Sequence, residues 1–182
     1  MAAKLLLICA AMWLAAAPSQ AATLTVSVLN LRSDAGELLI GVYDSAEGFT
    51  NAVADSATKS ALIPEKWRIV GASLRAKAGS QSITFRNLPP GRYAIVVFHD
   101  ENDNGLLDAN VLGVPVEGYG FSNDARGFLG APSFDAAAIA CQNADERINA
   151  SISLIYPRAV STEDQKDYDQ FMGTSQPPDH PR

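Results

Sequence analysis

The residues that most often carry catalysis are scarce in this chain. Its 182 residues include two cysteines, Cys9 and Cys141, and two histidines, His99 and His180. The chain contains no Gly-x-Ser-x-Gly turn, no His-Glu-x-x-His motif and no phosphate-binding loop. We therefore expect that the protein is not an enzyme. A Cys141–His99 pair, acting as nucleophile and base, is the remaining hydrolase alternative.

Positive charge is also in short supply. The chain has 14 Lys and Arg against 20 Asp and Glu, a net charge of −6, and no basic patch. This balance argues against nucleic acid and anionic membranes as partners. The N-terminal apolar run, residues 5–17, is shorter than the roughly 20 residues that a membrane-spanning helix needs. We therefore expect no membrane span.

The N-terminus instead has the layout of a secretory signal peptide. Lys4 precedes the apolar run, and small residues occupy positions −3 and −1 of a cut after Ala21. We predict that residues 1–21 are removed, with a cut after Ala22 as the alternative, and that the protein is exported, to the periplasm or outside the cell. Cleavage would remove Cys9 and leave Cys141 without an intrachain partner. We expect a buried thiol there, with pairing between chains as the alternative.

Polar and apolar residues alternate along several short segments bounded by turn residues, which is typical of half-buried strands. The expected strands are residues 23–31, 37–43, 67–78, 81–86, 92–99 and 147–156. The first two are separated by a short turn and predict a hairpin. A turn at 45–49 and a short helix within 52–61 are expected next. The run 92–99 is almost continuously apolar, so we expect it at the centre of its sheet.

No strong strand pattern follows in residues 100–146, apart from a helical turn or two expected within 132–141. Loops of this length are uncommon and are usually functional or disordered, and this one is rich in aromatic residues. We therefore predict an all-β fold: an antiparallel β-sandwich of about seven strands, immunoglobulin- or transthyretin-like, with one long ordered loop after the central strand. The domain would span residues 22–157, and residues 158–182 would form a flexible polar tail.

Two groups of motifs resemble known families. Residues 88–93 (Leu-Pro-Pro-Gly-Arg-Tyr), leading into His-Asp-Glu-Asn, are similar to transthyretin-like and carboxypeptidase-regulatory-like sandwiches. A longer series resembles the bacterial domain-of-unknown-function family 2141: His-Asp-Glu-Asn-Asp-Asn-Gly, Gly-Val-Pro, Glu-Gly-Tyr-Gly-Phe-Ser-Asn and Pro-Ser-Phe-Asp, between residues 99 and 135. The resemblance covers roughly residues 23–156. It implies an exported single β-sandwich of unassigned activity and supplies no catalytic residue.

The most informative stretch is the acidic segment 99–108, His-Asp-Glu-Asn-Asp-Asn-Gly-Leu-Leu-Asp. Oxygen-bearing side chains occupy positions 1, 3, 5 and 9 of a loop, with glycine at position 6, where calcium loops turn sharply. The expected metal ligands are Asp100, Asn102, Asn104, Asp108 and the backbone carbonyl of Leu106. Two carboxylates and neutral donors predict weak Ca²⁺ binding, about 10⁻⁴–10⁻³ M, as in extracellular modules.

Two features separate this segment from an EF-hand. Position 12 is Val111 in place of a bidentate Glu, and the flanking elements are not helices. Glu117 or Asp124 could fold back to complete the metal shell. The alternative is a solvated turn, because Asn-Gly is a strong turn dipeptide and Asp and Asn bond their own backbone. We expect His99 to pack or hydrogen-bond beside the loop, with transition-metal ligation as the alternative.

The Gly- and aromatic-rich residues 113–134 suggest a second function. They could form a carbohydrate- or peptide-binding surface, with candidate ligand-binding residues Glu117, Tyr119, Phe121 and Asn123. The alternative is a loop that buries its own aromatic side chains over the end of the sandwich. Our leading hypothesis is an exported, non-enzymatic β-sandwich with a Ca²⁺ loop and a structural or adhesion-like role toward an envelope or extracellular partner. The binding module is the alternative.

Overall fold

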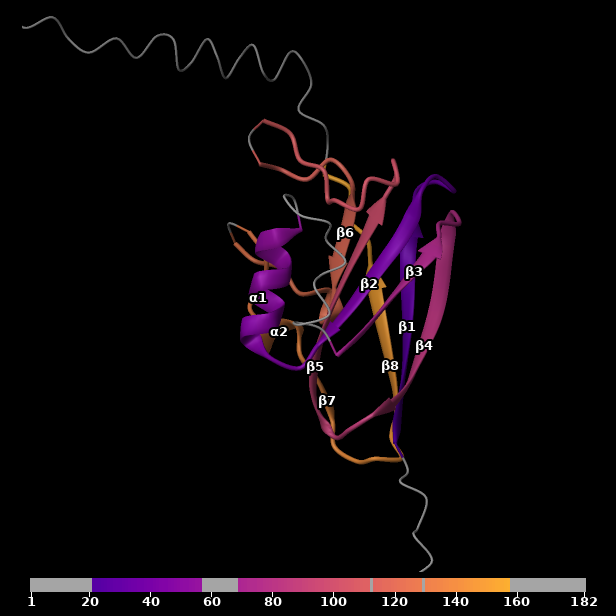
Figure 1. Cartoon of the computed structure of the whole chain (residues 1–182), viewed down its shortest axis with the longest axis vertical. Coiled ribbons are helices and arrows are strands. Elements are labelled where there is room, and N and C mark those ends of the chain that lie inside the picture. Colours follow the sequence, from indigo (N-terminus) through magenta and orange to yellow (C-terminus); the bar gives the residue numbers. More distant parts are fainter. Residues whose placement is uncertain (1–20, 57–68, 112, 129, 158–182) are drawn as a thin grey trace, which may run out of the picture.

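The computed structural model describes residues 21–56, 69–111, 113–128 and 130–157. The predicted tail 158–182, and all of the predicted signal peptide except Ala21, lie outside these ranges. The elements are β1 (Ala22–Leu31), β2 (Glu37–Tyr43), α1 (Ala46–Asp55), β3 (Val70–Arg75), β4 (Gly79–Leu88), β5 (Gly91–Asp100), β6 (Gly118–Phe121), the 3-10 helix η1 (Ser122–Asp124), α2 (Phe134–Ala137), β7 (Ile139–Cys141) and β8 (Arg147–Ser153) (Figure 1). No helix in these ranges is long and apolar enough to cross a membrane.

The strands form two stacked sheets, as the alternating pattern predicts. One sheet has the order β4-β1-β8, and the other has the order β3-β2-β5-β6, with β7 paired to the first residues of β5. Every pair is antiparallel except β1 and β8, which run parallel over seven residue pairs. The all-β sandwich is thus confirmed, with eight strands in the described part of the chain. The parallel pair departs from an all-antiparallel fold, and it is possible because the whole domain separates the two strands.

The predicted hairpin between the first two strands is wrong. β1 pairs with β4 and β8, whereas β2 pairs with β3 and β5, so the two strands lie in different sheets. The turn at residues 32–36 therefore carries the chain from one sheet to the other. Alternation identifies both strands, but it contains no information on which neighbour each strand chooses. Gly36 ends this turn with a φ of +68°, a conformation that favours glycine.

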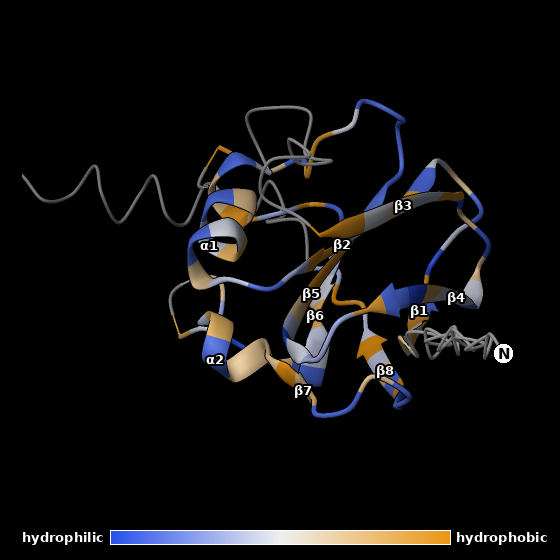
Figure 2. Cartoon of the chain, turned by 60° about the horizontal axis from the view of Figure 1, so that its bottom comes forward, coloured by the Kyte–Doolittle hydropathy of each residue, from blue (hydrophilic) through white to orange (hydrophobic). Residues whose placement is uncertain are grey.

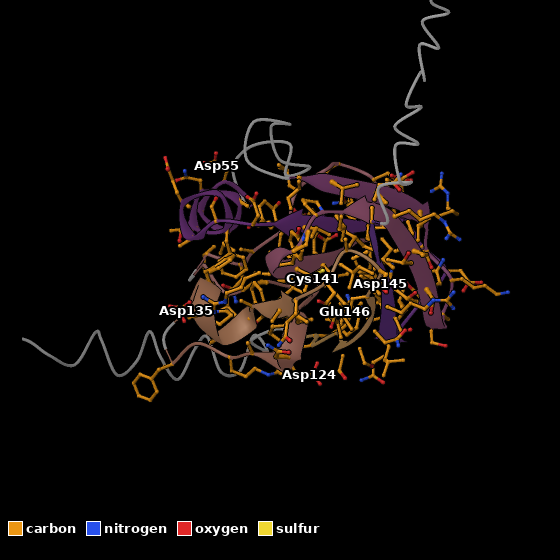
Figure 3. The ribbon with its side chains drawn as sticks, turned by 90° about the horizontal axis from the view of Figure 1, so that it is seen from below. Asp55, Asp124, Asp135, Cys141, Asp145 and Glu146 are labelled. Carbon is orange, nitrogen blue, oxygen red and sulfur yellow. The ribbon has the colours of Figure 1, made fainter. Side chains whose placement is uncertain are left out.

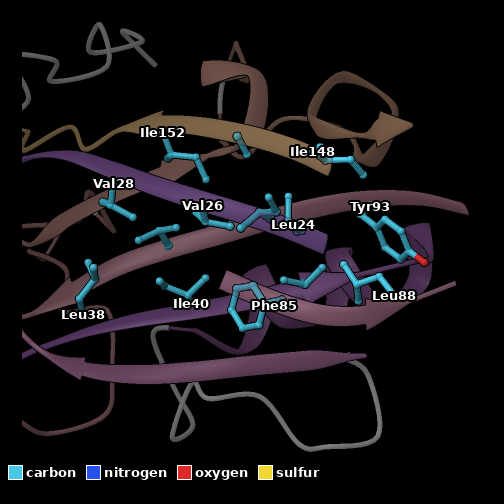
Figure 4. Close-up of a cluster of buried hydrophobic side chains, with 14 of the residues drawn as sticks. Leu24, Val26, Val28, Leu38, Ile40, Phe85, Leu88, Tyr93, Ile148 and Ile152 are labelled. Carbon is cyan, nitrogen blue, oxygen red and sulfur yellow. The ribbon is translucent and has the colours of Figure 1, made fainter. Parts of the chain in front are cut away.

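The main core fills the space between the two sheets. Inward-facing residues of β1, β2 and β5 alternate with outward-facing ones, as the period-two pattern requires. The largest fully buried members are Leu24, Val26, Val28, Leu38, Ile40, Val42, Ile95, Val97 and Ile152 (Figure 4). Phe85, Leu88 and Tyr93 close the cluster at the end where β4 turns into β5.

A second, smaller core lies on the opposite face of the larger sheet, under α1 and α2, which lie side by side there (Figure 2). Phe49 of α1 packs against Tyr43 and Phe121, with ring centroids 6.2 and 5.9 Å apart. β5 is therefore buried on both faces, which explains its continuous apolar run and confirms its central position.

The helix α1 begins where we expected a turn. Ser45 is its N-cap and accepts a hydrogen bond from the backbone N–H of Gly48 at 3.2 Å. The helix ends at Asp55, so it overlaps only the first part of the expected segment 52–61, and residues 57–61 lie outside the described ranges. The N-cap serine was a start signal that the turn interpretation overlooked.

Residues 100–146 are more structured than expected. They contain β6, η1, α2 and β7, of which only the helical turn of α2 was predicted. β6 is Gly-Tyr-Gly-Phe and β7 has three residues, so neither is long enough to show a strand period. Both strands form by pairing with β5, which is a tertiary cause that the local sequence does not reveal.

Candidate functional site

The acidic loop begins at the last residue of β5. Asp100 is buried, and its carboxylate points back into the loop that follows. Oδ1 accepts the backbone N–H of Asn104 at 3.1 Å, and Oδ2 accepts that of Gly105 at 2.6 Å. Positive φ values at Asp103 (60°) and Gly105 (75°) turn the chain around this carboxylate. The residue at loop position 1 therefore organises positions 5 and 6, as the turn chemistry of Asp predicts.

The side chains at loop positions 3, 5 and 9 meet one another. The amide nitrogen of Asn102 donates to Asp108 Oδ2 at 2.7 Å, and that of Asn104 lies 3.1 Å from both oxygens of Asp108. The amide oxygens accept backbone N–H groups of the loop, Asn104 at 3.1 Å and Leu106 at 2.7 Å. The structure thus brings the four predicted side-chain ligands into one loop, cross-linked by hydrogen bonds.

Glu117, one of the two residues that we expected could complete the metal shell, does fold back onto this loop. Its carboxylate is buried, and it accepts the backbone N–H of Glu101 at 2.8 Å and that of Asp108 at 3.0 Å. It therefore bridges the two ends of the loop. The other candidate, Asp124, lies elsewhere and accepts the backbone N–H of Ser153 at 2.8 Å.

The surroundings of Glu117 disfavour its charged form. Burial raises the pKa of its carboxyl above the ordinary value, and the charges of Asp108 and Asp100 act in the same direction. The two backbone N–H bonds oppose this effect, because they stabilise the carboxylate. The site therefore concentrates negative charge that its protein neighbours only partly compensate.

Two arginines neutralise only part of the loop. Arg32 forms a two-pronged ion pair with Glu101, and the hydrogen bond from Arg32 lowers the pKa of that carboxyl. Arg75 pairs with Asp103 at 3.0 Å. Asp100, Asp108 and Glu117 make no ion pair within the described ranges, so three carboxylates remain without a basic partner. In this part of the chain, no group of three or more His, Cys, Asp or Glu side chains is placed so that it could hold a metal ion.

His99 supports the loop from behind. It is fully buried, and its Nε2 lies 2.7 Å from the carbonyl oxygen of Ala35, so this nitrogen carries the proton. Nδ1 then accepts the hydroxyl of Tyr156 at 2.7 Å. The guanidinium of Arg32 lies over the Tyr156 ring, 4.4 Å from its centroid. The expectation that His99 packs and hydrogen-bonds beside the loop is confirmed.

The Cys141–His99 alternative is wrong. Cys141 pairs with Gly91 at the start of β5, and His99 lies eight residues further along the same strand. At about 3.3 Å per residue, the two side chains are separated by roughly 26 Å. Cys141 is buried, as expected, and lies within the electrostatic reach of Glu146 (Figure 3). Burial raises the pKa of the thiol, which disfavours the reactive thiolate.

The four predicted ligand-binding residues of the aromatic segment are divided among different places. Glu117 belongs to the acidic loop, and the amide of Asn123 donates to the carbonyls of Ala136 and Ala138 beside α2. Phe121 is buried beneath α1, in line with a loop that packs its own aromatics. Tyr119 is partly exposed, and its ring packs at 6.0 Å against Phe121.

Tyr119 and Phe121 also line a hollow of about 320 Å³ that was not foreseen as a unit. Its walls are formed by Val114, Tyr119, Phe121, Ala125, Arg126, Gly127, Gly130, Ile155 and Pro157. Phe128, which lies between the two lining glycines in sequence, is 97% exposed. Residues 155–157 join the hollow because Tyr119 and Ile155 exchange backbone hydrogen bonds at 3.0 and 2.8 Å. The sequence signal was only the richness in glycine and aromatics.

A comparison of the sequence with protein-family models gave a match to a bacterial family. The model described as "Uncharacterized protein conserved in bacteria (DUF2141)" matches residues 26–149. The match extends from β1 to β8 and includes the acidic loop, Glu117 and β6. Neither the comparison with curated proteins nor that with solved structures gave a match.

Proposed function

Since the chain belongs to the bacterial DUF2141 family, whose members are described as uncharacterized, we propose its function from the site itself: an exported, non-enzymatic β-sandwich whose 100–108 loop binds Ca²⁺. The observation that carries the proposal is that Asp100, Asp108 and Glu117, three carboxylates without basic partners in the described part of the chain, all bond to one loop. They do not yet converge as a metal-holding group, so binding would have to draw them together around the cation. Bound Ca²⁺ would offset their mutual repulsion and hold the loop for a structural or adhesion-like role in the envelope.

The donor set suits a hard cation. Each oxygen of Asp100 and Glu117 accepts one backbone N–H, and a carboxylate offers about four lone-pair sites, so each keeps capacity for a metal. The amide oxygens of Asn102 and Asn104 likewise retain a lone pair. Binding would require Asp108 to exchange the amide N–H groups that it now accepts for the cation. This exchange supports the weak affinity expected of extracellular modules, about 10⁻⁴–10⁻³ M.

Thermal and chemical unfolding with and without Ca²⁺ tests the proposal. At 10 mM Ca²⁺ the free energy of unfolding should rise by about 1.4–2.7 kcal/mol, because a ligand specific to the folded state stabilises it by RT ln(1 + [L]/Kd). Asp108→Asn should abolish most of this rise. Asp135→Asn should preserve it, since Asp135 is exposed and pairs with Arg92 away from the loop. A wild-type protein that shows no rise at matched ionic strength would refute Ca²⁺ binding.

A second candidate function is favoured by the hollow beside β6. The hollow supports the carbohydrate- or peptide-binding alternative, since ligand sites are usually concave and lined mainly by apolar and aromatic side chains, here including Tyr119 and Phe121. Phe128, which is almost fully exposed, lies in sequence between two of the lining glycines. The apolar lining favours a peptide side chain over a sugar. A peptide library and a glycan array separate the two. Phe128→Ala should remove binding while leaving stability within about 0.5 kcal/mol, and unchanged binding would refute this candidate.

A further inference from the structure

On the outer face of the β4-β1-β8 sheet, polar side chains of neighbouring strands are aligned in rows. Strand register places residues in rows across it, because side chains at alternate positions point away from the core. The rows are Thr84, Thr25 and Asn149, then Ser82, Ser27 and Ser151, with Thr23 opposite Arg147 at one end. Hydroxyl groups of neighbouring strands bond across the rows, Thr25 to Thr84 at 3.3 Å and Ser27 to Ser82 at 2.9 Å.

A shallow hollow of about 520 Å³ lies at the Thr23 end of this face. It is lined by Thr23, Thr25, Thr84, Arg86, Arg147 and Asn149. Arg86 follows Thr84 by two residues on β4, and Arg147 begins β8, so the arginines stand on the two strands that flank β1. Neighbouring strands are about 4.8 Å apart, which separates the two arginine backbones by roughly 10 Å. Both guanidinium groups can therefore reach one ligand lying over Thr23.

In the described part of the chain, no carboxylate pairs with either of these two arginines. Within the described ranges neither Arg86 nor Arg147 forms an ion pair, whereas Arg32, Arg75 and Arg92 each pair with a carboxylate. The outward-facing positions of the three strands contain no Asp or Glu. Glu146, the neighbour of Arg147, instead accepts the backbone N–H groups of Gln142 and Asn143. In a chain of net charge −6, this hollow is a local positive site.

We propose that this hollow binds an acidic saccharide through its anionic group. Arg86 and Arg147 would hold the phosphate, sulfate or carboxylate, because the guanidinium fork matches such oxyanions. The hydroxyls of Thr23, Thr25 and Thr84 and the amide of Asn149 can both donate and accept, as the hydroxyl groups of a sugar require. Among the described residues no aromatic side chain lines the hollow, so the sheet face favours a polar ligand over a stacked base.

This site is independent of the proposed Ca²⁺ loop. Ala22, next to Thr23, faces Leu88, which precedes β5, whereas the acidic loop follows the other end of β5. The two sites are thus at opposite ends of the sandwich. Saccharide binding should be the same in Ca²⁺ and in EDTA, so the failure of one proposal is distinguishable from the failure of the other.

Calorimetric titration at low ionic strength tests the inference with three probes: glucose 6-phosphate, inorganic phosphate and glucose. We expect glucose 6-phosphate to bind at least tenfold more tightly than phosphate, and glucose not to bind. Affinity should fall as NaCl is added, because charge attraction is screened. Equal affinity for phosphate and glucose 6-phosphate would show an oxyanion site only and would overturn the saccharide assignment.

Variants at the hollow complete the test. Arg86→Gln and Arg147→Gln should each weaken glucose 6-phosphate binding at least tenfold, and Arg92→Gln, at an exposed arginine outside the hollow, should not. The thermal midpoints of the first two variants should stay near wild type, since neither arginine forms an ion pair with another described residue. Thr84→Val should weaken glucose 6-phosphate more than phosphate. Wild-type affinity in the Arg86→Gln, Arg147→Gln double variant would refute the site.

Discussion

Gly36 is the residue whose replacement most directly tests how the acidic loop is held. Its φ is +68°, and a Cβ built there would lie inside van der Waals contact of the Asp100 carbonyl oxygen, 2.7 Å from the Glu101 Cα and 2.8 Å from the Asp100 carbonyl carbon. These are backbone atoms at the start of the acidic loop, so no side-chain rotation relieves the contact. Left-handed strain in Gly36→Ala should cost about 1–2 kcal/mol, and overpacking about 1–3 kcal/mol.

The expected loss of about 2–5 kcal/mol is measured by urea unfolding followed by circular dichroism. Gly79→Ala is the matched control, because Gly79 also has a positive φ, +95°, but a Cβ there would meet nothing within 4 Å. It should lose only the strain, about 1–2 kcal/mol. The Ca²⁺-dependent stabilisation should also shrink in Gly36→Ala and persist in Gly79→Ala. Equal stabilities of the two variants would refute the close approach of Gly36 to Asp100.

Two further outcomes follow from buried groups. Tyr156→Phe removes the hydroxyl bonded to His99 Nδ1 and should cost about 1–3 kcal/mol by urea unfolding; a change below 0.5 kcal/mol would contradict the bond. Burial raises the pKa of the Cys141 thiol above its ordinary value, so its contribution to stability should be complete below the pKa of the unfolded chain and lost as pH rises through the folded-state pKa. Iodoacetamide at pH 8 should therefore alkylate the folded protein at least tenfold more slowly than the urea-unfolded one, and equal rates would exclude a buried thiol.

The sequence predicts those strands whose pattern of polar and apolar residues follows from which of their faces are buried. β1 alternates because one face meets the core and the other meets solvent, and β5 is continuously apolar because both faces are covered. The pairing partners of each strand are harder to predict from the sequence. The predicted hairpin between β1 and β2 is wrong because a five-residue turn can connect two strands of one sheet or two strands of different sheets. β6 and β7 depend on pairing with β5, which no local pattern records.

The acidic loop likewise has features that local sequence predicts and features that only the fold determines. Asp100, Asn102, Asn104 and Asp108 were predictable because their bonds join residues two to six positions apart. Glu117 was named as one of two candidates, but the sequence could not choose between it and Asp124. The contribution of Arg32 was not visible at all, because it pairs with Glu101 across 69 positions of sequence. Local turn chemistry is readable from sequence, whereas charge compensation across the sandwich depends on the fold.

Glu117 connects the two candidate functional regions through consecutive residues. Its carboxylate holds both ends of the acidic loop, and the next residue, Gly118, begins β6. A side chain at Gly118 would collide with the ring of Tyr156, whose hydroxyl bonds His99 behind the loop. One residue further, Tyr119 forms a wall of the apolar hollow. If the loop binds Ca²⁺ and the hollow binds peptide as proposed, order imposed on the loop by the cation would act on the strand that shapes the hollow. Calorimetric titration of a peptide ligand should then give tighter binding in Ca²⁺ than in EDTA, and binding at the distant arginine site should be the same in both.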